Sequence, residues 1–249
     1  MRRIAIALSK GGVGKTTTAV NLAAGLAQAG NRVLLVDVDT QGQAGRSLGL
    51  EPQWGLAELA TGDAPPESAV IQARENLWLL AGGRSLAGIE RLIVRKDFGG
   101  EQTIAEILAR IDSSYDFVIL DTSPGWDTLT VNALFYADEV LSPVSMEVMA
   151  LQSLQDFTQS LQSIQRYHKG LTFSYILPTF MDRRVKKSAE IQAQLQTHFP
   201  DQYCEPIRYN VRLSEAPGYG QTIYEYSPRS TGAADYQQLT TRILNDDQS

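Results

Sequence analysis

The chain has 249 residues, of which 43% are hydrophobic and 20% are charged, as expected for a globular protein with a substantial core. Its formal net charge of −6 argues against general affinity for nucleic acid, so any contact with DNA has to come from a local patch. Its one cysteine, Cys204, excludes an internal disulfide, and without an apolar run of ~18 residues or a signal-peptide pattern we expect a cytoplasmic protein.

Short β-rich runs alternate with helical patterns, which predicts an α/β fold with a mostly parallel, twisted sheet covered by helices on both faces. The predicted strands are residues 4–8, 33–39, 77–81, 117–121, 139–144, 173–178 and 204–207. The predicted helices are residues 19–27, 101–112, 149–166, 186–198 and 232–245, and residues 61–68 are predicted to form a loop. Because we see no linker or repeat, we expect residues 1–249 to form a single domain.

A glycine-rich stretch, S-K-G-G-V-G-K-T-T-T at residues 9–18, lies between the first predicted strand and the first predicted helix. Strand, glycine turn and helix form the context of a phosphate-binding loop, in which backbone N–H groups and the helix N-terminus attract an anion. Lys15 would supply a charge for the β- and γ-phosphates of ATP, and the Thr16 hydroxyl would be a ligand of Mg²⁺. The candidate ATP-binding residues are Lys10, Gly11, Gly12, Val13, Gly14, Lys15, Thr16 and Thr17.

This loop departs from the general G-x-x-x-x-G-K-[ST] pattern, because Ser9 replaces the first glycine and Lys10 follows at once. Lys10 could simply be a solvated loop lysine. The word K-G-G-x-G-K-T nevertheless resembles the deviant P-loop of the ParA/MinD group of ATPases. The resemblance implies a three-layer P-loop NTPase fold and an ATP-sandwich homodimer. It also implies that Lys15 acts in catalysis and that Lys10 reaches across the dimer to the nucleotide of the partner subunit.

Two acids, Asp37 and Asp39, close the second predicted strand. In a parallel sheet this strand end lies at the same edge as the phosphate loop, so the two carboxylates can face the nucleotide, although strand-end acids also cap turns. The run L-V-D-V-D-T-Q-G resembles the D-x-D-P-Q-G switch I segment of ParA-type ATPases, with Gln41 and Gly42 in place. The resemblance implies that Asp39 positions the attacking water, and Thr40 stands where the family usually has proline.

Asp121 follows four apolar residues at the end of the fourth predicted strand, which is the Walker B form. The form predicts that Asp121 holds Mg²⁺ through a water, although a strand-end acid can also cap a helix. The T-S-P-G that follows resembles the switch II of the family and includes Pro124 and Gly125. By the same resemblance Glu147 would pair with Lys10 when the nucleotide does not, and an ordinary solvated glutamate is an equally good interpretation.

A basic cluster, R-R-V-K-K, occupies residues 183–187, and most such clusters are solvated surfaces. A later segment, Y-N-V-R-L-S-E-A-P, resembles a C-terminal segment of ParA/Soj proteins, in which the arginines of a D-x-R turn and of V-R-L bind DNA phosphates. The resemblance gives these roles to Arg184 and Arg212. The candidate DNA-binding residues are therefore Arg183, Arg184, Lys186, Lys187 and Arg212. Family alignment also suggests that Phe180, Met181 and Pro206 lie near the adenine base, where they could equally be core residues.

The resemblance covers most of the chain and implies an ATPase that dimerises on ATP, binds non-specific nucleoid DNA and positions cargo. A partner protein would stimulate hydrolysis, a ParB-like adaptor for a plasmid or chromosome or an McdB-like adaptor for a carboxysome, as in the McdA branch. The alternative is a MinD-like membrane-cycling ATPase, but the chain ends in a polar, acidic tail rather than a basic amphipathic helix. A third interpretation is a metabolic P-loop enzyme related to nitrogenase reductase, which needs two cysteines per chain, or to dethiobiotin synthetase, which has no need of Arg184 and Arg212.

Overall fold

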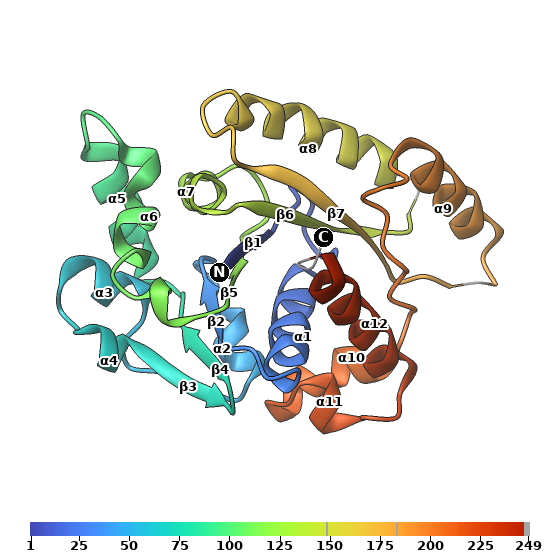
Figure 1. The fold of residues 1–249 in the computed structure, drawn as a ribbon, viewed down its shortest axis with the longest axis horizontal. Coiled ribbons are helices and arrows are strands. Elements are labelled where there is room, and N and C mark those ends of the chain that lie inside the picture. Colours follow the sequence, from blue (N-terminus) through green and yellow to red (C-terminus); the bar gives the residue numbers. More distant parts are fainter. Residues whose placement is uncertain (148, 183, 247–249) are drawn as a thin grey trace.

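The computed structural model of the protein describes residues 1–147, 149–182 and 184–246 (Figure 1). A seven-stranded sheet runs through the molecule in the order β3-β4-β2-β5-β1-β6-β7. Neighbouring strands are parallel except for β3 and β4, which are antiparallel. The prediction of a mostly parallel sheet in an α/β fold is therefore confirmed.

The elements have the following bounds. The strands are β1 Arg2–Ile6, β2 Val33–Asp37, β3 Val70–Arg74, β4 Leu77–Leu80, β5 Phe117–Asp121, β6 Glu139–Ser145 and β7 Thr172–Thr179. The longer helices are α1 Lys15–Gln28, α5 Leu86–Arg95, α7 Thr128–Tyr136, α8 Ala150–Gln165, α9 Lys186–His198 and α12 Thr231–Asp246. The shorter ones are α2 Gln43–Ser47, α3 Leu56–Thr61, α4 Pro66–Ala69, α6 Thr103–Leu108, α10 Val211–Glu215 and α11 Ile223–Tyr226, with 3-10 turns η1 Gly100–Gln102, η2 Asp112–Ser114 and η3 Ala216–Tyr219.

Side chains of the central strands alternate between two hydrophobic cores, one on each face of the sheet. On β1, Ile4 and Ile6 belong to the core that includes α1 and α12, whereas Ala5 belongs to the core that includes α7 and α8. Figure 1 shows these two pairs of helices on opposite faces of the sheet. Because both faces are buried, the strands are continuous apolar runs, which is why the sequence patterns were easy to recognise.

Three predicted elements differ from the structure. Residues 204–207 form no strand of the described sheet, because Pro206 has no N–H for a ladder. The isolated bridges lie on either side of this segment, where Tyr203 pairs with Ile176 and Arg208 pairs with Met181. The helix predicted over 101–112 is confined to α6 and tightens into 3-10 turns at both sides, as helix ends often do. The loop predicted over 61–68 includes the start of the short helix α4, and the edge strand β3 after it was not predicted.

The carboxyl ends of three adjacent strands meet at one edge of the sheet. Ile6 at the end of β1 is in register with Asp121 at the end of β5, and Asp121 is in register with Asp37 at the end of β2. The glycine-rich loop and the two candidate switch segments therefore start side by side. Within the described residues, no helix combines the length and the apolar character that crossing a membrane requires.

Candidate nucleotide-binding site

The glycine-rich loop connects β1 to the N-terminus of α1. Gly12 and Gly14 have φ angles of 71° and 90°, a left-handed conformation in which a side chain would be strained. The hydroxyl of Thr179, at the end of β7, donates a hydrogen bond of 2.9 Å to the carbonyl of Val13. This bond connects the loop to a strand that lies two places from β1 in the sheet. The loop thus ends at the positive end of a 14-residue helix, which favours an anion.

The side chain of Lys15 is buried inside the loop. Its Nζ donates to the carbonyl oxygens of Leu8, at 3.2 Å, and Lys10, at 2.9 Å. Burial lowers the pKa of Lys15, while the nearby carboxylates of Asp121 and Asp39 act in the opposite direction. A phosphate entering the loop would give this partly desolvated ammonium a counter-charge, so the geometry suits the predicted role of Lys15.

The carboxylate of Asp37 accepts two backbone hydrogen bonds from the switch I segment. Its Oδ1 accepts from the N–H of Asp39 at 2.9 Å, and its Oδ2 accepts from the N–H of Ala44, in α2, at 3.0 Å. The carboxyl is fully buried, and burial raises its pKa to about 7. Asp37 therefore holds both ends of the turn that presents Asp39, whose own Oδ1 accepts from the N–H of Gln41 at 2.9 Å.

Gly82, which follows β4, was not among the predicted site residues, yet it packs against the same turn. A Cβ atom at Gly82 would lie 2.6 Å from the carbonyl oxygen of Asp37 and 2.8 Å from that of Asp39. Its neighbour Gly83 donates its N–H to the Asp39 carbonyl at 3.0 Å. The Gly-Gly pair at the end of this strand was the signal in the sequence, but its contact with switch I depends on strand order.

Asp121 fits a magnesium-binding role. Both carboxylate oxygens are buried and have no hydrogen-bond partner among the described residues. Burial, followed by repulsion from Asp37, raises the pKa of Asp121, and the adjacent Thr16 hydroxyl and Lys15 ammonium oppose this shift. No cluster of three or more metal-ligating His, Cys, Asp or Glu occurs in the described part of the chain. Mg²⁺ that is bound to a nucleotide usually takes only one or two ligands from the protein, and Thr16 and Asp121 would be those ligands here.

Two adjoining pockets lie over these residues and share Gly14 and Thr17. The larger, of about 350 Å³, is polar and is lined by Gly11, Gly12, Gly14, Lys15, Thr16, Thr17, Asp39, Gln41, Gln43, Thr122 and Pro124. The smaller, of about 140 Å³, is more apolar and is lined by Gly14, Thr17, Thr179, Phe180, Ile207, Tyr209, Asn210, Leu213, Ser214 and Tyr236. The polar pocket suits phosphates and the apolar pocket suits a base.

Several predicted site residues lie outside the lining of these two pockets. Phe180 lines the apolar pocket, but Met181 is buried in the core, and neither Met181 nor Pro206 is among the described residues that line it. Tyr209, Asn210 and Leu213 take that place, although the sequence had suggested only a DNA-binding role for their segment. Val13 and Gly42 are also absent from the lining, and it is their backbone that shapes the glycine-rich loop and switch I, respectively. Gly42 begins α2 with a φ of 63°, and Gly125 has a φ of 105° in switch II.

Lys10 points to Glu147 rather than into the phosphate pocket. Its Nζ lies 2.5 Å from Oε2 of Glu147, and the side chains are 31% and 66% exposed, respectively. Glu147 follows β6, so the ion pair spans from one side of the glycine-rich loop to the next strand. The structure therefore contains the Lys10–Glu147 pair that the sequence resemblance implied.

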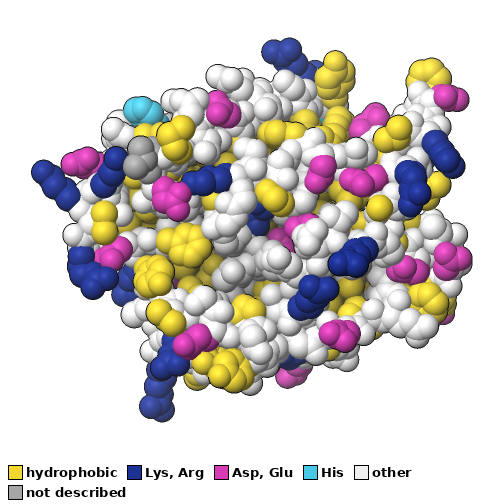
Figure 2. Space-filling model, turned by 180° about the vertical axis from the view of Figure 1, so that it is seen from behind, with side chains coloured by type: hydrophobic (Ala, Val, Ile, Leu, Met, Phe, Trp, Pro, Cys, Tyr) yellow, Lys and Arg dark blue, Asp and Glu magenta, His cyan; other side chains and the backbone are white. Residues whose placement is uncertain are grey.

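The candidate DNA-binding residues lie at two segments that start side by side. The N–H of Tyr209 donates to the carbonyl of Met181 at 3.0 Å, and the chain reaches Arg184 and Arg212 three residues beyond each of these. Several Lys and Arg side chains lie along the left edge of Figure 2, at the end of the molecule that α9 occupies. Arg183 lies outside the described residues.

Local acids already pair with both arginines. Arg184 Nη2 lies 2.7 Å from Oδ2 of Asp182, and Arg212 Nη1 lies 2.9 Å from Oε2 of Glu215. These pairs are solvent-exposed, and exposed pairs are weak enough for a phosphate to replace the acid. Lys186 and Lys187 form the exposed first turn of α9, where the helix dipole disfavours cations.

Comparison with known proteins gives one family. The model of the AAA_31 family, described as an AAA domain, matches residues 1–173. The chain is 38% identical over 246 residues to the chromosome-partitioning ATPase Soj of Thermus thermophilus, covering 98% of this chain and 96% of that one. It is 37% identical to the sporulation initiation inhibitor protein Soj of Bacillus subtilis, covering 96% and 97%.

A solved structure shares the whole fold. Cobyrinic acid a,c-diamide synthase from Mycobacterium smegmatis, with bound ADP and magnesium, superposes with a TM-score of 0.86 at 30% identity, covering 100% of this chain and 96% of that one. The same protein has also been solved with an ATP analogue and magnesium. An adenine nucleotide with Mg²⁺ is therefore the ligand that occupies this fold in a related protein, in agreement with the pocket geometry.

Proposed function

Since this chain belongs to the AAA_31 family and, within it, to the ParA/Soj group of partitioning ATPases, we propose that it is a DNA-dependent cargo-positioning ATPase. In this proposal it dimerises on ATP, binds duplex DNA of the nucleoid without sequence preference, and is released when a partner protein stimulates hydrolysis. The observation that supports the proposal is the second lysine of the glycine-rich loop, Lys10, which lies beside a complete phosphate pocket but pairs with Glu147 instead of entering that pocket. The cargo is a chromosome, a plasmid or a carboxysome, and the partner is a ParB- or McdB-like adaptor.

Hydrolysis needs three things from this chain. Lys15 and the amides of the loop would bind the β- and γ-phosphates, and Thr16 and Asp121 would hold Mg²⁺, which offsets the charge of the phosphates when bound. Asp39 lines the phosphate pocket next to these groups and is proposed to orient the attacking water. Because Asp37 and the Gly82–Gly83 turn fix the backbone on both sides of Asp39, the carboxylate is held in place before the nucleotide binds.

Dimerisation through the nucleotide face is supported by the apolar side chains around the base pocket. Phe180 and Tyr209 line that pocket and are still 46% and 61% exposed, and Val211 beside them is 52% exposed. Exposed apolar groups gathered around a ligand site are typical of a surface that a partner covers. In this proposal, Lys10 of a second copy that covers this surface reaches the nucleotide of the first copy.

DNA binding would come from two basic patches, one on each chain of the dimer. The single chain is acidic, so one patch of Arg184, Lys186, Lys187 and Arg212 is expected to bind duplex DNA weakly. In the dimer the second contact becomes intramolecular, which raises affinity by ~10²-fold or more. If about six phosphates are neutralised, a plot of the logarithm of the binding constant against the logarithm of the salt concentration has a slope near −5. The affinity should be nearly independent of the DNA sequence.

A gel-shift experiment on unrelated duplexes, in ATP, in ADP and across a range of salt, tests the proposal. We expect ATP-dependent binding, and we expect Arg212→Glu to lose it while still binding ATP and dimerising. Equal binding in ATP and ADP would refute control of DNA binding by the nucleotide. No binding in ATP at low salt would refute DNA as the surface on which the protein moves its cargo. The second result would favour a membrane-cycling function, against which the structure offers one observation: the apolar side of α12, including Leu239 and Ile243, is buried against the core.

A further inference from the structure

A second polar pocket, of about 420 Å³, adjoins the phosphate pocket along switch I. Gln41 lines both pockets, and the second pocket is also lined by Arg46 of α2 and by Arg84, which lies between β4 and α5. We call it the arginine pocket. It is somewhat larger than the phosphate pocket, which has about 350 Å³, so it has room for a phosphate ion.

Two backbone segments pack against each other beside the arginine pocket. The carbonyl oxygen of Asp39 accepts from the N–H of Gly42, in switch I, and from the N–H of Gly83, after β4, both at 3.0 Å. A Cβ atom at Gly42 would lie 3.2 Å from the Cα atom of Gly83, so the two segments are in direct contact. Because closely packed segments transmit displacements, a ligand in this pocket would act on the turn that presents Asp39.

The two arginines of the pocket have no partner among the described residues. Arg46 and Arg84 are exposed, and no ion pair or side-chain hydrogen bond joins either guanidinium to another residue in the described part of the chain. Arg74, Arg208 and Arg212, in contrast, each pair with a carboxylate. A guanidinium presents a planar fork of N–H donors that matches two oxygens of an anion, so two such forks favour an anion with several oxygens.

The other polar groups of the lining agree with a small oxyanion. Glu51 contributes one carboxylate against two guanidinium groups, so the pocket has a net positive charge. The Thr40 hydroxyl and the Gln41 side-chain amide also belong to the lining, and within the described residues neither forms a side-chain hydrogen bond. With two arginines, a hydroxyl and an amide as donors, the pocket suits a tetrahedral phosphate better than a single carboxylate.

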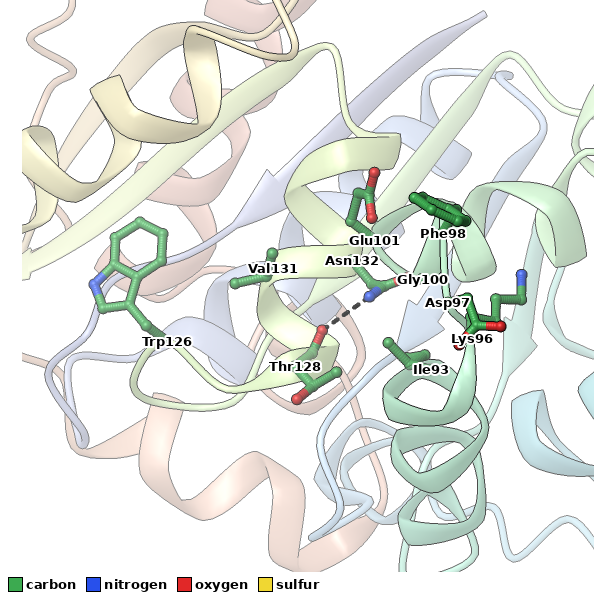
Figure 3. Close-up of a pocket in the computed structure, with 11 residues that line it drawn as sticks. Ile93, Lys96, Asp97, Phe98, Gly100, Glu101, Trp126, Thr128, Val131 and Asn132 are labelled. Carbon is green, nitrogen blue, oxygen red and sulfur yellow. Dashed lines mark hydrogen bonds between the residues drawn. The ribbon is translucent and has the colours of Figure 1, made fainter.

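A larger groove elsewhere on the molecule has the opposite charge. This groove, of about 570 Å³, lies between the loop that follows α5 and the first turns of α7, and Figure 3 shows its lining. Nζ of Lys96 is already 2.6 Å from Oε2 of Glu106, and the lining adds Asp97 and Glu101. Volume alone therefore does not select a phosphate site, and the charges favour the arginine pocket.

Gln41 connects an anion in the arginine pocket to hydrolysis. Its N–H donates to Oδ1 of Asp39, the residue proposed to orient the attacking water, at 2.9 Å. Because Gln41 lines both pockets, an anion that binds its side chain from the arginine pocket would draw switch I away from the phosphate pocket. We propose that the arginine pocket binds inorganic phosphate, the product of ATP hydrolysis, and that phosphate bound there slows turnover. This inference rests on the proposed function, because the product forms only if the chain hydrolyses ATP.

The binding experiment uses the Asp39→Ala chain with saturating ATP and Mg²⁺, so that the nucleotide occupies the phosphate pocket and only a separate site is open to the probe. Equilibrium dialysis with radiolabelled inorganic phosphate, at an ionic strength held constant with chloride, should show saturable binding. We expect Arg46→Ala and Arg84→Ala each to weaken this binding by about tenfold, because each removes charged hydrogen-bond donors. The matched control is Arg95→Ala, which removes an exposed arginine of α5 outside the pocket and should change binding by less than about twofold.

Turnover of the wild-type chain tests the effect on hydrolysis. Added phosphate should lower kcat without changing KM for ATP, and the two pocket variants should need about tenfold more phosphate for the same inhibition. Inhibition that is competitive with ATP would place the anion in the phosphate pocket and overturn the proposal. Absence of binding in the dialysis experiment, or equal weakening by Arg95→Ala, would also overturn it.

A gel shift with duplex DNA distinguishes free phosphate from the phosphates of DNA as the occupant. We expect Arg46→Ala and Arg84→Ala to bind DNA as the wild-type chain does. Loss of DNA binding with unchanged phosphate binding would assign both arginines to the DNA surface and refute the phosphate site. The proposed function fails separately, if the wild-type chain without added phosphate shows neither ATP hydrolysis nor ATP-dependent DNA binding.

Discussion

Replacing Glu147 by glutamine tests whether the ion pair with Lys10 opposes dimerisation. Both side chains are solvent-exposed, at 66% and 31%, so the pair is worth ~0.2–1 kcal/mol despite its 2.5 Å distance. A symmetric dimer uses two copies of Lys10 and therefore breaks two pairs, at a cost of ~0.4–2 kcal/mol. Removing that cost should lower the dissociation constant of the ATP-bound dimer by about 2-fold to 30-fold.

Sedimentation velocity in ATP and Mg²⁺ measures this constant, with Asp39→Ala in both chains so that hydrolysis does not deplete the dimer. Glu67→Gln, at an exposed position on α4, removes one negative charge elsewhere and should leave the constant unchanged. Lys10→Ala should lose the dimer and still bind ATP as a monomer. An unchanged or weaker dimer in Glu147→Gln would show that the pair does not compete with dimerisation, and ATP-dependent dimers of Lys10→Ala would refute the role of Lys10 across the interface.

Three further variants probe the site itself. Lys15→Ala should weaken ATP binding by about 2–5 kcal/mol in calorimetry, because the phosphates lose a buried counter-charge, and wild-type affinity would refute the assignment. Asp39→Ala should bind ATP normally, hydrolyse it ~10²–10⁴-fold more slowly and accumulate as a dimer, so wild-type turnover would contradict it. Gly82→Ala should slow hydrolysis and cost about 1–3 kcal/mol of stability in denaturant unfolding, whereas Gly88→Ala, with nothing near its Cβ, should do neither.

The sequence predicted best those features that depend on neighbouring residues. The buried strand 117–121 and the helix 186–198 have the predicted bounds, because a continuous apolar run and a 3.6-residue period are local signals. The phosphate loop was recognisable for the same reason, since strand, glycines, lysine and helix follow one another directly. The pairing of Lys10 with Glu147 needed the family resemblance, because 137 residues separate the two side chains.

The base pocket and the support of switch I could not be predicted, because they arise where distant segments pack together. Gly82 contacts Asp37 only because β4 lies beside β2 in the sheet, although 45 positions separate the two residues. Met181 was expected near the base, but its backbone pairs with residues 207–209, and this pairing buries its side chain and brings Tyr209 to the pocket. A pattern of apolar residues does not say which of them line a cavity and which fill the core.

Asn210 joins the base pocket to the proposed DNA-binding surface. Its side chain lines the pocket, its Oδ1 accepts from the N–H of Arg212 at 2.9 Å, and its Nδ2 donates to the hydroxyl of Thr231, at the start of α12, at 2.9 Å. Avidity in a dimer explains why ATP would strengthen DNA binding, but it leaves each single patch unchanged. A base that touches Asn210 would also restrain the helix that presents Arg212, so nucleotide occupancy would act on the patch within one chain before the second chain arrives.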